Sequence, residues 1–129
     1  MFGASPCRAD DWDEDGVGDY AVGAPFAGAS RPCSEGVVVI VSGKTFLPIR
    51  HLFGSKQSDH IGWTLTPLAD MDGDGFEELG VEGQELLRVF GRGGKVLWSV
   101  EERLNCLATY RDVNGDALPD VLVRRAASL

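Results

Sequence analysis

Short runs of apolar residues recur along the chain, and turns rich in Gly, Asp and Pro separate them. The clearest run is residues 37–41, Val-Val-Val-Ile-Val, in which β-branched side chains favour a strand. A turn at 42–45 and an apolar run at 46–52 follow, so this region is predicted to be a β-hairpin. Pro48 predicts that the returning strand lies at a sheet edge, because proline cannot donate to the ladder.

The same succession of elements recurs further along the chain. A strand at 86–90, a turn at 91–94 and a strand at 95–100 predict a second hairpin. Upstream of the hairpins, pairs of predicted strands flank acidic segments that show no helical periodicity. Each period therefore consists of a strand, an acidic loop, a second strand, a linker and a hairpin. This gives four antiparallel strands per period. The predicted strands around the acidic segments include residues 20–22, 65–69, 79–81, 107–110 and 121–123.

Repeated four-stranded antiparallel units of about 40–60 residues are typical of a β-propeller. The chain holds two such units and half of a third, and propellers close with about four to eight blades. We therefore predict an all-β fold: a partial β-propeller over residues 1–129, with repeats at about 2–60, 61–102 and 103–129, that does not close a ring alone. We expect it to be a fragment, or to complete a ring by association.

Each acidic loop carries side-chain oxygens at its positions 1, 3, 5 and 9, and Gly occupies position 6 in the first two copies. A tight turn brings alternating side chains to one point, and Gly provides the positive φ that such a turn needs. Ca²⁺ takes six to eight oxygen ligands, which these side chains and the position-7 carbonyl largely supply. The predicted ligands, for up to three Ca²⁺ ions, are Asp11, Asp13, Asp15, Val17 and Asp19; Asp70, Asp72, Asp74, Phe76 and Glu78; and Asp112, Asn114, Asp116, Leu118 and Asp120.

These loops differ from an EF-hand loop, which needs a bidentate acid at position 12. That position is Val22, Val81 and Val123 here, which indicates a strand leaving each loop. Mg²⁺ is less suited, because it tends to keep several waters. Empty Asp-Gly turns are the alternative, but three copies in the same register argue against it. In the third copy, Ala117 at position 6 makes the site the least secure.

The charge distribution supports the loops as cation sites. The chain has 129 residues and a net charge of −8, and 14 of its 20 acidic residues lie in or next to the three loops. Three Ca²⁺ ions would nearly neutralise this excess. Nucleic acid is a poor partner for such a chain, since phosphate contacts need clustered Lys and Arg. The longest apolar run is too short for a membrane span, and the residues after Met1 show no signal peptide.

The motifs resemble those of a known repeat family. Phe2-Gly3, the loop at 11–19 and Val22-Gly23-Ala24-Pro25 together resemble the FG-GAP repeat of integrin α-chain propellers and of many secreted bacterial proteins. Residues 36–43, 61–63 and 68–75 extend the resemblance through a full period. It implies a seven-bladed propeller in complete members, Ca²⁺ in the blade loops, and extracellular adhesion or ligand binding. The second copy departs from the motif at Val81-Glu82-Gly83, and Glu78 replaces Asp at position 9.

The expected function is thus a calcium-binding segment of an extracellular or cell-surface propeller, acting as a structural, adhesion or ligand-binding module. Its partners would be a protein or glycan ligand, or further blades. The alternative is the non-catalytic repeats of a secreted hydrolase, lyase or phospholipase. We expect no enzymatic activity, since the Ser, Asp and His at 58–60 lack a nucleophile motif.

The cysteines and tryptophans add less. Cys7 and Cys33 could form a disulfide across the first repeat, or the cysteines, including Cys106, could be free thiols, and none has zinc-site spacing. The three tryptophans are expected to pack in the fold, although Trp12 lies in a loop, where it could be exposed.

Overall fold

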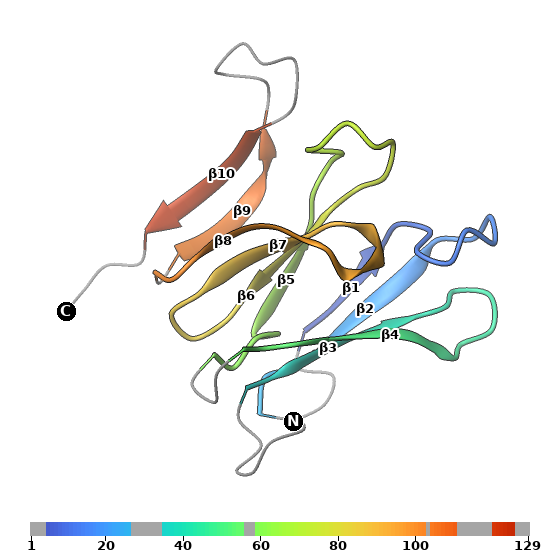
Figure 1. The fold of residues 1–129 in the computed structure, drawn as a ribbon, viewed down its shortest axis with the longest axis horizontal. Coiled ribbons are helices and arrows are strands. Elements are labelled where there is room, and N and C mark those ends of the chain that lie inside the picture. Colours follow the sequence, from blue (N-terminus) through green and yellow to red (C-terminus); the bar gives the residue numbers. More distant parts are fainter. Residues whose placement is uncertain (1–4, 27–34, 56–58, 103, 111–119, 126–129) are drawn as a thin grey trace.

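The computed structural model describes residues 5–26, 35–55, 59–102, 104–110 and 120–125. Over these residues the protein is all-β, with two four-stranded antiparallel sheets and a two-stranded hairpin (Figure 1). A single 3₁₀ turn, η1 (Arg92–Gly94), is the one helical segment in the described part of the chain. The predicted all-β class and the four-stranded antiparallel units are confirmed.

The first sheet contains β1 (Ser5–Ala9), β2 (Asp19–Ala24), β3 (Val37–Val41) and β4 (Pro48–Phe53), paired in that order. β3 is the central apolar strand, and its residues 37–40 are all buried. This is why its sequence is continuously hydrophobic rather than alternating. β4 is an edge strand, as Pro48 predicted, and its pairing with β3 shifts register between Ile40 and Val41.

The second sheet repeats this order with β5 (Thr64–Pro67), β6 (Leu79–Glu82), β7 (Leu87–Phe90) and β8 (Val96–Val100). Its last pair also shifts register, between Val89 and Phe90. The final hairpin pairs β9 (Leu104–Tyr110) with β10 (Asp120–Arg125). The hairpin matches the first two strands of each sheet, so the structure follows the predicted succession of two units and half of a third.

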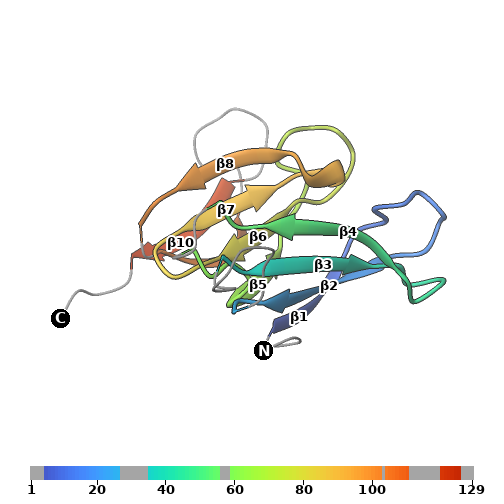
Figure 2. The same cartoon turned by 60° about the horizontal axis from the view of Figure 1, so that its bottom comes forward.

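The sheets pack against one another as successive layers. Figure 2 shows the first sheet lying against the second, with the β9–β10 hairpin beyond it, and the contacts follow the same order. Side chains of both sheets form one core, to which Val38 and Ile40 contribute from β3 and Leu65 and Val81 from the second sheet. Trp12 also joins this core and is only 7% exposed, so the suggestion that its loop position exposes it is wrong.

Glycine allows the two sheets to touch through their backbones. A Cβ added at Gly23, at the end of β2, would lie 2.2 Å from the carbonyl oxygen of Gly62, which itself has φ +102°. Next to this point, Gly36 forms a parallel bridge with Ile61. Gly23 belongs to the Val-Gly-Ala-Pro motif at 22–25, Gly62 to the matching segment at 61–63, and Gly36 to the one at 36–43. The motifs are therefore separated along the chain but meet at the contact between neighbouring sheets.

Some strand boundaries differ from the prediction. The strand predicted at 46–52 begins at Pro48, because the turn before it extends further: Phe46 donates its N–H to the Ser42 carbonyl and has φ +61°. The strand predicted at 65–69 spans Thr64–Pro67, and the one predicted at 107–110 begins at Leu104.

Candidate metal centres

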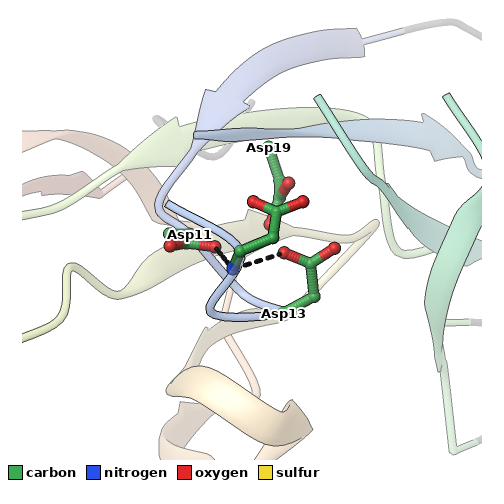
Figure 3. A group of neighbouring side chains, drawn as sticks. Asp11, Asp13 and Asp19 are labelled. Atoms are coloured by element: carbon green, nitrogen blue, oxygen red, sulfur yellow. Dashed lines mark hydrogen bonds between the residues drawn. The ribbon is translucent and has the colours of Figure 1, made fainter. Parts of the chain in front are cut away.

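The loop between β1 and β2 gathers the four carboxylates predicted as ligands. Asp11, Asp13, Asp15 and Asp19 each offer an oxygen, and these four oxygens lie within 4.8 Å of one another. Figure 3 shows Asp11, Asp13 and Asp19 around the same point of the loop. The backbone holds Asp11 in place: Gly16 N–H donates to its Oδ2 at 2.8 Å and Asp15 N–H to its Oδ1 at 3.0 Å.

The loop between β5 and β6 has the same internal architecture. Asp70, Asp72, Asp74 and Glu78 converge within the same 4.8 Å limit. Asp70 accepts from Gly75 N–H at 2.8 Å and from Asp74 N–H at 3.1 Å, as Asp11 does from the equivalent residues. The sequence repeat is therefore a repeat of hydrogen bonds, and position 1 organises the backbone of each loop.

Positive φ angles occur at two positions of each loop. Gly16 and Gly75 at position 6 have φ +87° and +88°, as predicted. The sequence interpretation missed position 4, where Glu14 has φ +59° and Gly73 has φ +80°. The available signal was the glycine that two of the three copies carry at that position, Gly73 and Gly115.

Position 9 distinguishes the two loops. Asp19 is buried, and both of its oxygens accept hydrogen bonds, from Trp12 N–H at 2.6 Å and from Gly43 N–H at 3.0 Å. Glu78 is only 2% exposed, and its Oε2 accepts from Met71 N–H. Among the described residues, its Oε1 has no hydrogen-bond partner. A buried, unpartnered carboxylate oxygen is costly unless a proton or a cation compensates for the lost water.

The pKa values show where the crowded charges repel. Burial, followed by the charges of Asp72 and its acidic neighbours, raises the pKa of Glu78 to about 7, although the Met71 N–H lowers it. Burial likewise raises the pKa of Asp13, with help from the charges of Asp19 and Asp15. The pKa of Asp72 is also raised, first by burial. A bound cation would relieve this repulsion.

At loop position 1, the pKa values of Asp11 and Asp70 shift in the opposite direction. Burial on its own would raise the pKa of Asp11, but the backbone hydrogen bonds from Gly16 and Asp15 outweigh it, and the pKa is lowered. The pKa of Asp70 is lowered for the same reasons, with Gly75 and Gly73 as the principal donors. The loop backbone therefore holds one carboxylate of each cluster in its charged form.

The two loops contact each other directly, which the sequence did not predict. Glu77 N–H in the second loop donates to Asp10 Oδ2, beside the first loop, at 2.8 Å. Arg92 of η1 forms an ion pair with Glu14 at 2.7 Å, and its guanidinium lies 3.6 Å from the centre of the Phe76 ring. The two clusters are thus neighbours at one end of the packed sheets.

Several predicted residues lie outside the described part of the chain. Residues 112–118 of the third loop are among them, and for Asp120 the structure describes only the backbone, in β10. The third site stays a prediction, as do the carbonyl ligands at Val17 and Phe76. Cys7 is a free, half-buried thiol, and burial raises its pKa to about 11. Cys33 lies outside the described residues.

The Asp and His of the Ser-Asp-His sequence have structural partners. Asp59 is buried and accepts from Ser55 N–H at 2.7 Å. His60 Nδ1 lies 3.2 Å from the Pro25 carbonyl oxygen, and its ring contacts that of Phe26.

Trp63 and Trp98 are 45% and 42% exposed, so they pack less fully than expected. In the described residues no helix has the length and apolar character needed to cross a membrane.

A scan against models of known protein families gave no match to this chain.

Proposed function

We propose that the chain is a calcium-binding segment of an extracellular, FG-GAP-like β-propeller, in which it acts as a structural, adhesion or ligand-binding module. The observation that carries this proposal is the second loop. There, Glu78 is buried with Oε1 unpartnered, beside three further carboxylates whose oxygens lie within 4.8 Å. A cation in this loop would give that oxygen a partner.

The size and chemistry of the clusters favour Ca²⁺ over other ions. All the side-chain ligands are oxygens, which suits a hard cation. At Ca–O distances of about 2.3–2.6 Å, oxygens on opposite sides of the ion are about 5 Å apart, so one Ca²⁺ can reach oxygens within 4.8 Å of each other. Mg²⁺ is less suited, because it binds at about 2.0–2.1 Å in near-ideal octahedral geometry and usually keeps several waters rather than taking a cage of protein ligands.

The propeller assignment is supported by the repetition of the sheets. Two four-stranded sheets with the same strand order pack as layers, and a half unit follows in the same succession. Repeated units bury their faces against neighbours, so further blades are the partners that the arrangement suits best. Together with the motif resemblance, this repetition supports a propeller in which the acidic loops would lie at one end of consecutive blades.

Calorimetric titration of the stripped protein with Ca²⁺ tests the proposal. We expect the substitutions Asp13→Asn and Asp72→Asn each to weaken one site by about tenfold or more, because ligand charge governs Ca²⁺ affinity. Each Asn keeps an oxygen that can accept the N–H of position 5, as Asp13 and Asp72 do now. Glu77→Gln is the control: it removes the same charge from an exposed neighbour outside the ligand set. The absence of Ca²⁺-dependent heat, or equal losses in all three variants, would refute it.

A further inference from the structure

A cleft of about 370 Å³ lies between the edge of the first sheet and the outer strands of the second. One wall is β4 and Ser55 just after it, and the other is formed by β7, Gly94 and β8. Its volume falls within the range of about 300–1,000 Å³ that is usual for small-ligand sites. The cleft involves none of the acidic-loop ligands and has no part in the function proposed above.

The charge of this cleft is opposite to that of the protein. Arg50 contributes from β4 and Arg88 from β7, with His51 beside Arg50, and no acidic residue is among the described residues lining it. The chain as a whole carries a net charge of −8. Two guanidinium groups from different sheets therefore face one cavity that lacks carboxylates, and guanidinium groups bind carboxylate, sulfate and phosphate oxygens through paired hydrogen bonds.

Neighbouring groups hold the two arginines in this position. Arg88 Nε donates to Ser99 Oγ, on the adjacent strand β8, at 3.3 Å. Gly94, with φ +83°, makes room for Arg50: a Cβ there would lie 3.1 Å from Arg50 Cδ and 3.2 Å from Leu52 Cδ2. A glycine in η1 thus lets the arginine of one sheet lie against the backbone of the other.

Side chains along β4 alternate between the two faces of the first sheet. Arg50 and Leu52 pair with Ile40 and Val38 and so face the second sheet, whereas the stacked rings of His51 and Phe53 lie on the opposite face. Ser55 and Ser99 add hydroxyl groups that can donate or accept.

We propose that this cleft is a binding site for an oxyanion, in which Arg50 and Arg88 hold the charged group and the hydroxyl groups of Ser55 and Ser99 can bond to it. The carboxylate of an acidic monosaccharide and a free inorganic oxyanion share this charged group. The site would connect two neighbouring sheets, so a ligand there would contact both.

The test uses the Ca²⁺-loaded protein and amide NMR shifts during titrations with sodium sulfate, D-glucuronate and glucose, in low-chloride buffer. We expect shifts at β4 and β8 with both anions. Tighter binding of glucuronate would identify a sugar carboxylate as the ligand, and tighter binding of sulfate would identify an inorganic oxyanion; either result supports the site. Glucose should cause no such shifts. Glucose binding as tightly as glucuronate, or the absence of shifts with both anions, would overturn the proposal.

Matched variants locate the binding. Arg50→Gln and Arg88→Gln should each weaken the binding of the tighter anion by roughly tenfold, since each removes a charged donor. Lys44→Gln removes the same charge from an exposed turn outside the cleft and should change binding less than about twofold. Retained Ca²⁺ binding shows that a variant is folded. Equal effects of the three substitutions would overturn the assignment, because they would reflect net charge alone.

Discussion

At the scale of single residues, the two acidic loops differ by one methylene group at position 9. Asp19 and Glu78 occupy the same position, and both accept the N–H of loop position 2. Asp19 has a second donor in Gly43, on the turn after β3. By strand register, Arg92 takes the place of Gly43 in the second sheet, and among the described residues Glu78 Oε1 has no hydrogen-bond partner. The second loop should therefore depend more strongly on its ion than the first.

This difference predicts how stability depends on pH without metal. The pKa of Glu78 is about 7 in the folded protein, against an ordinary value of 4.5. Below pH 4.5 the Glu78 carboxyl group is protonated in both the folded and the unfolded state. Between pH 4.5 and 7 only the folded state keeps this proton, so the free energy of unfolding falls as the pH rises. The stabilisation from the proton is lost above pH 7. Relative to the Glu78→Gln variant, the wild type should lose on the order of 2 kcal/mol between pH 5 and 8.

Urea unfolding of both proteins in metal-free buffer at several pH values measures this difference. Carboxylates common to the two proteins cancel in the comparison. A difference in unfolding free energy that stays constant from pH 5 to 8 would contradict the assigned state of Glu78.

At the scale of elements, the glycine motifs determine how sheets approach one another. Gly23→Ala places a Cβ 2.2 Å from the backbone carbonyl of Gly62, and a backbone atom on the neighbouring sheet cannot simply rotate away. We expect a loss of about 3 kcal/mol or more in the free energy of unfolding, at the upper end of the usual cost of overpacking. Chemical denaturation measures the loss.

Gly18→Ala is the matched control for this substitution. Its added Cβ would lie 3.6 Å from the Ala9 carbonyl oxygen, which is an ordinary contact, so its effect should stay within about 0.5 kcal/mol. If the two variants were equally stable, backbone contact would not be the reason for the motif.

The elements also show what the sequence could predict. The strand at 37–41 was predicted with its observed bounds, because five consecutive β-branched residues are a local signal. The loop carboxylates were predictable because their convergence depends on spacing within nine residues. Phe46 was placed in a strand because its apolar character suggested one, whereas the hydrogen bonds of the turn decide its conformation.

Features that depend on contacts between units left no local signal. Trp12 lies in an acidic loop, yet packing between the sheets buries it. Arg92 comes from a glycine-rich turn and contacts both acidic loops, at Glu14, which is 78 positions away, and at Phe76, which is 16 positions away. The two arginines of the cleft are likewise 38 positions apart, and only the packing of β4 against the second sheet brings them together. Periodicity and motif spacing describe single units, so they cannot reveal such pairs.

At the scale of the whole molecule, a cation bound in the acidic loops would stabilise both sheets. Each loop joins two adjacent strands, and the loops contact each other through Glu77 and Asp10 and through Arg92 and Glu14. An ion in either loop would stabilise the folded state and the contact between units. At a free Ca²⁺ concentration of about 100 times Kd, each site would add about 2.7 kcal/mol by mass action.

Thermal melting should therefore respond to Ca²⁺ in a specific way. We expect a chelator to lower Tm by roughly 10 °C or more, since about 1 kcal/mol shifts Tm by several degrees in a domain of this size. Excess Ca²⁺ should restore it, while KCl at matched ionic strength should not, because screening weakens repulsion at every exposed carboxylate without occupying a site. Asp13→Asn and Asp72→Asn should each reduce the part of the Tm shift that depends on Ca²⁺. A Tm that responds equally to KCl and to Ca²⁺ would mean that screening, rather than bound ions, stabilises the fold.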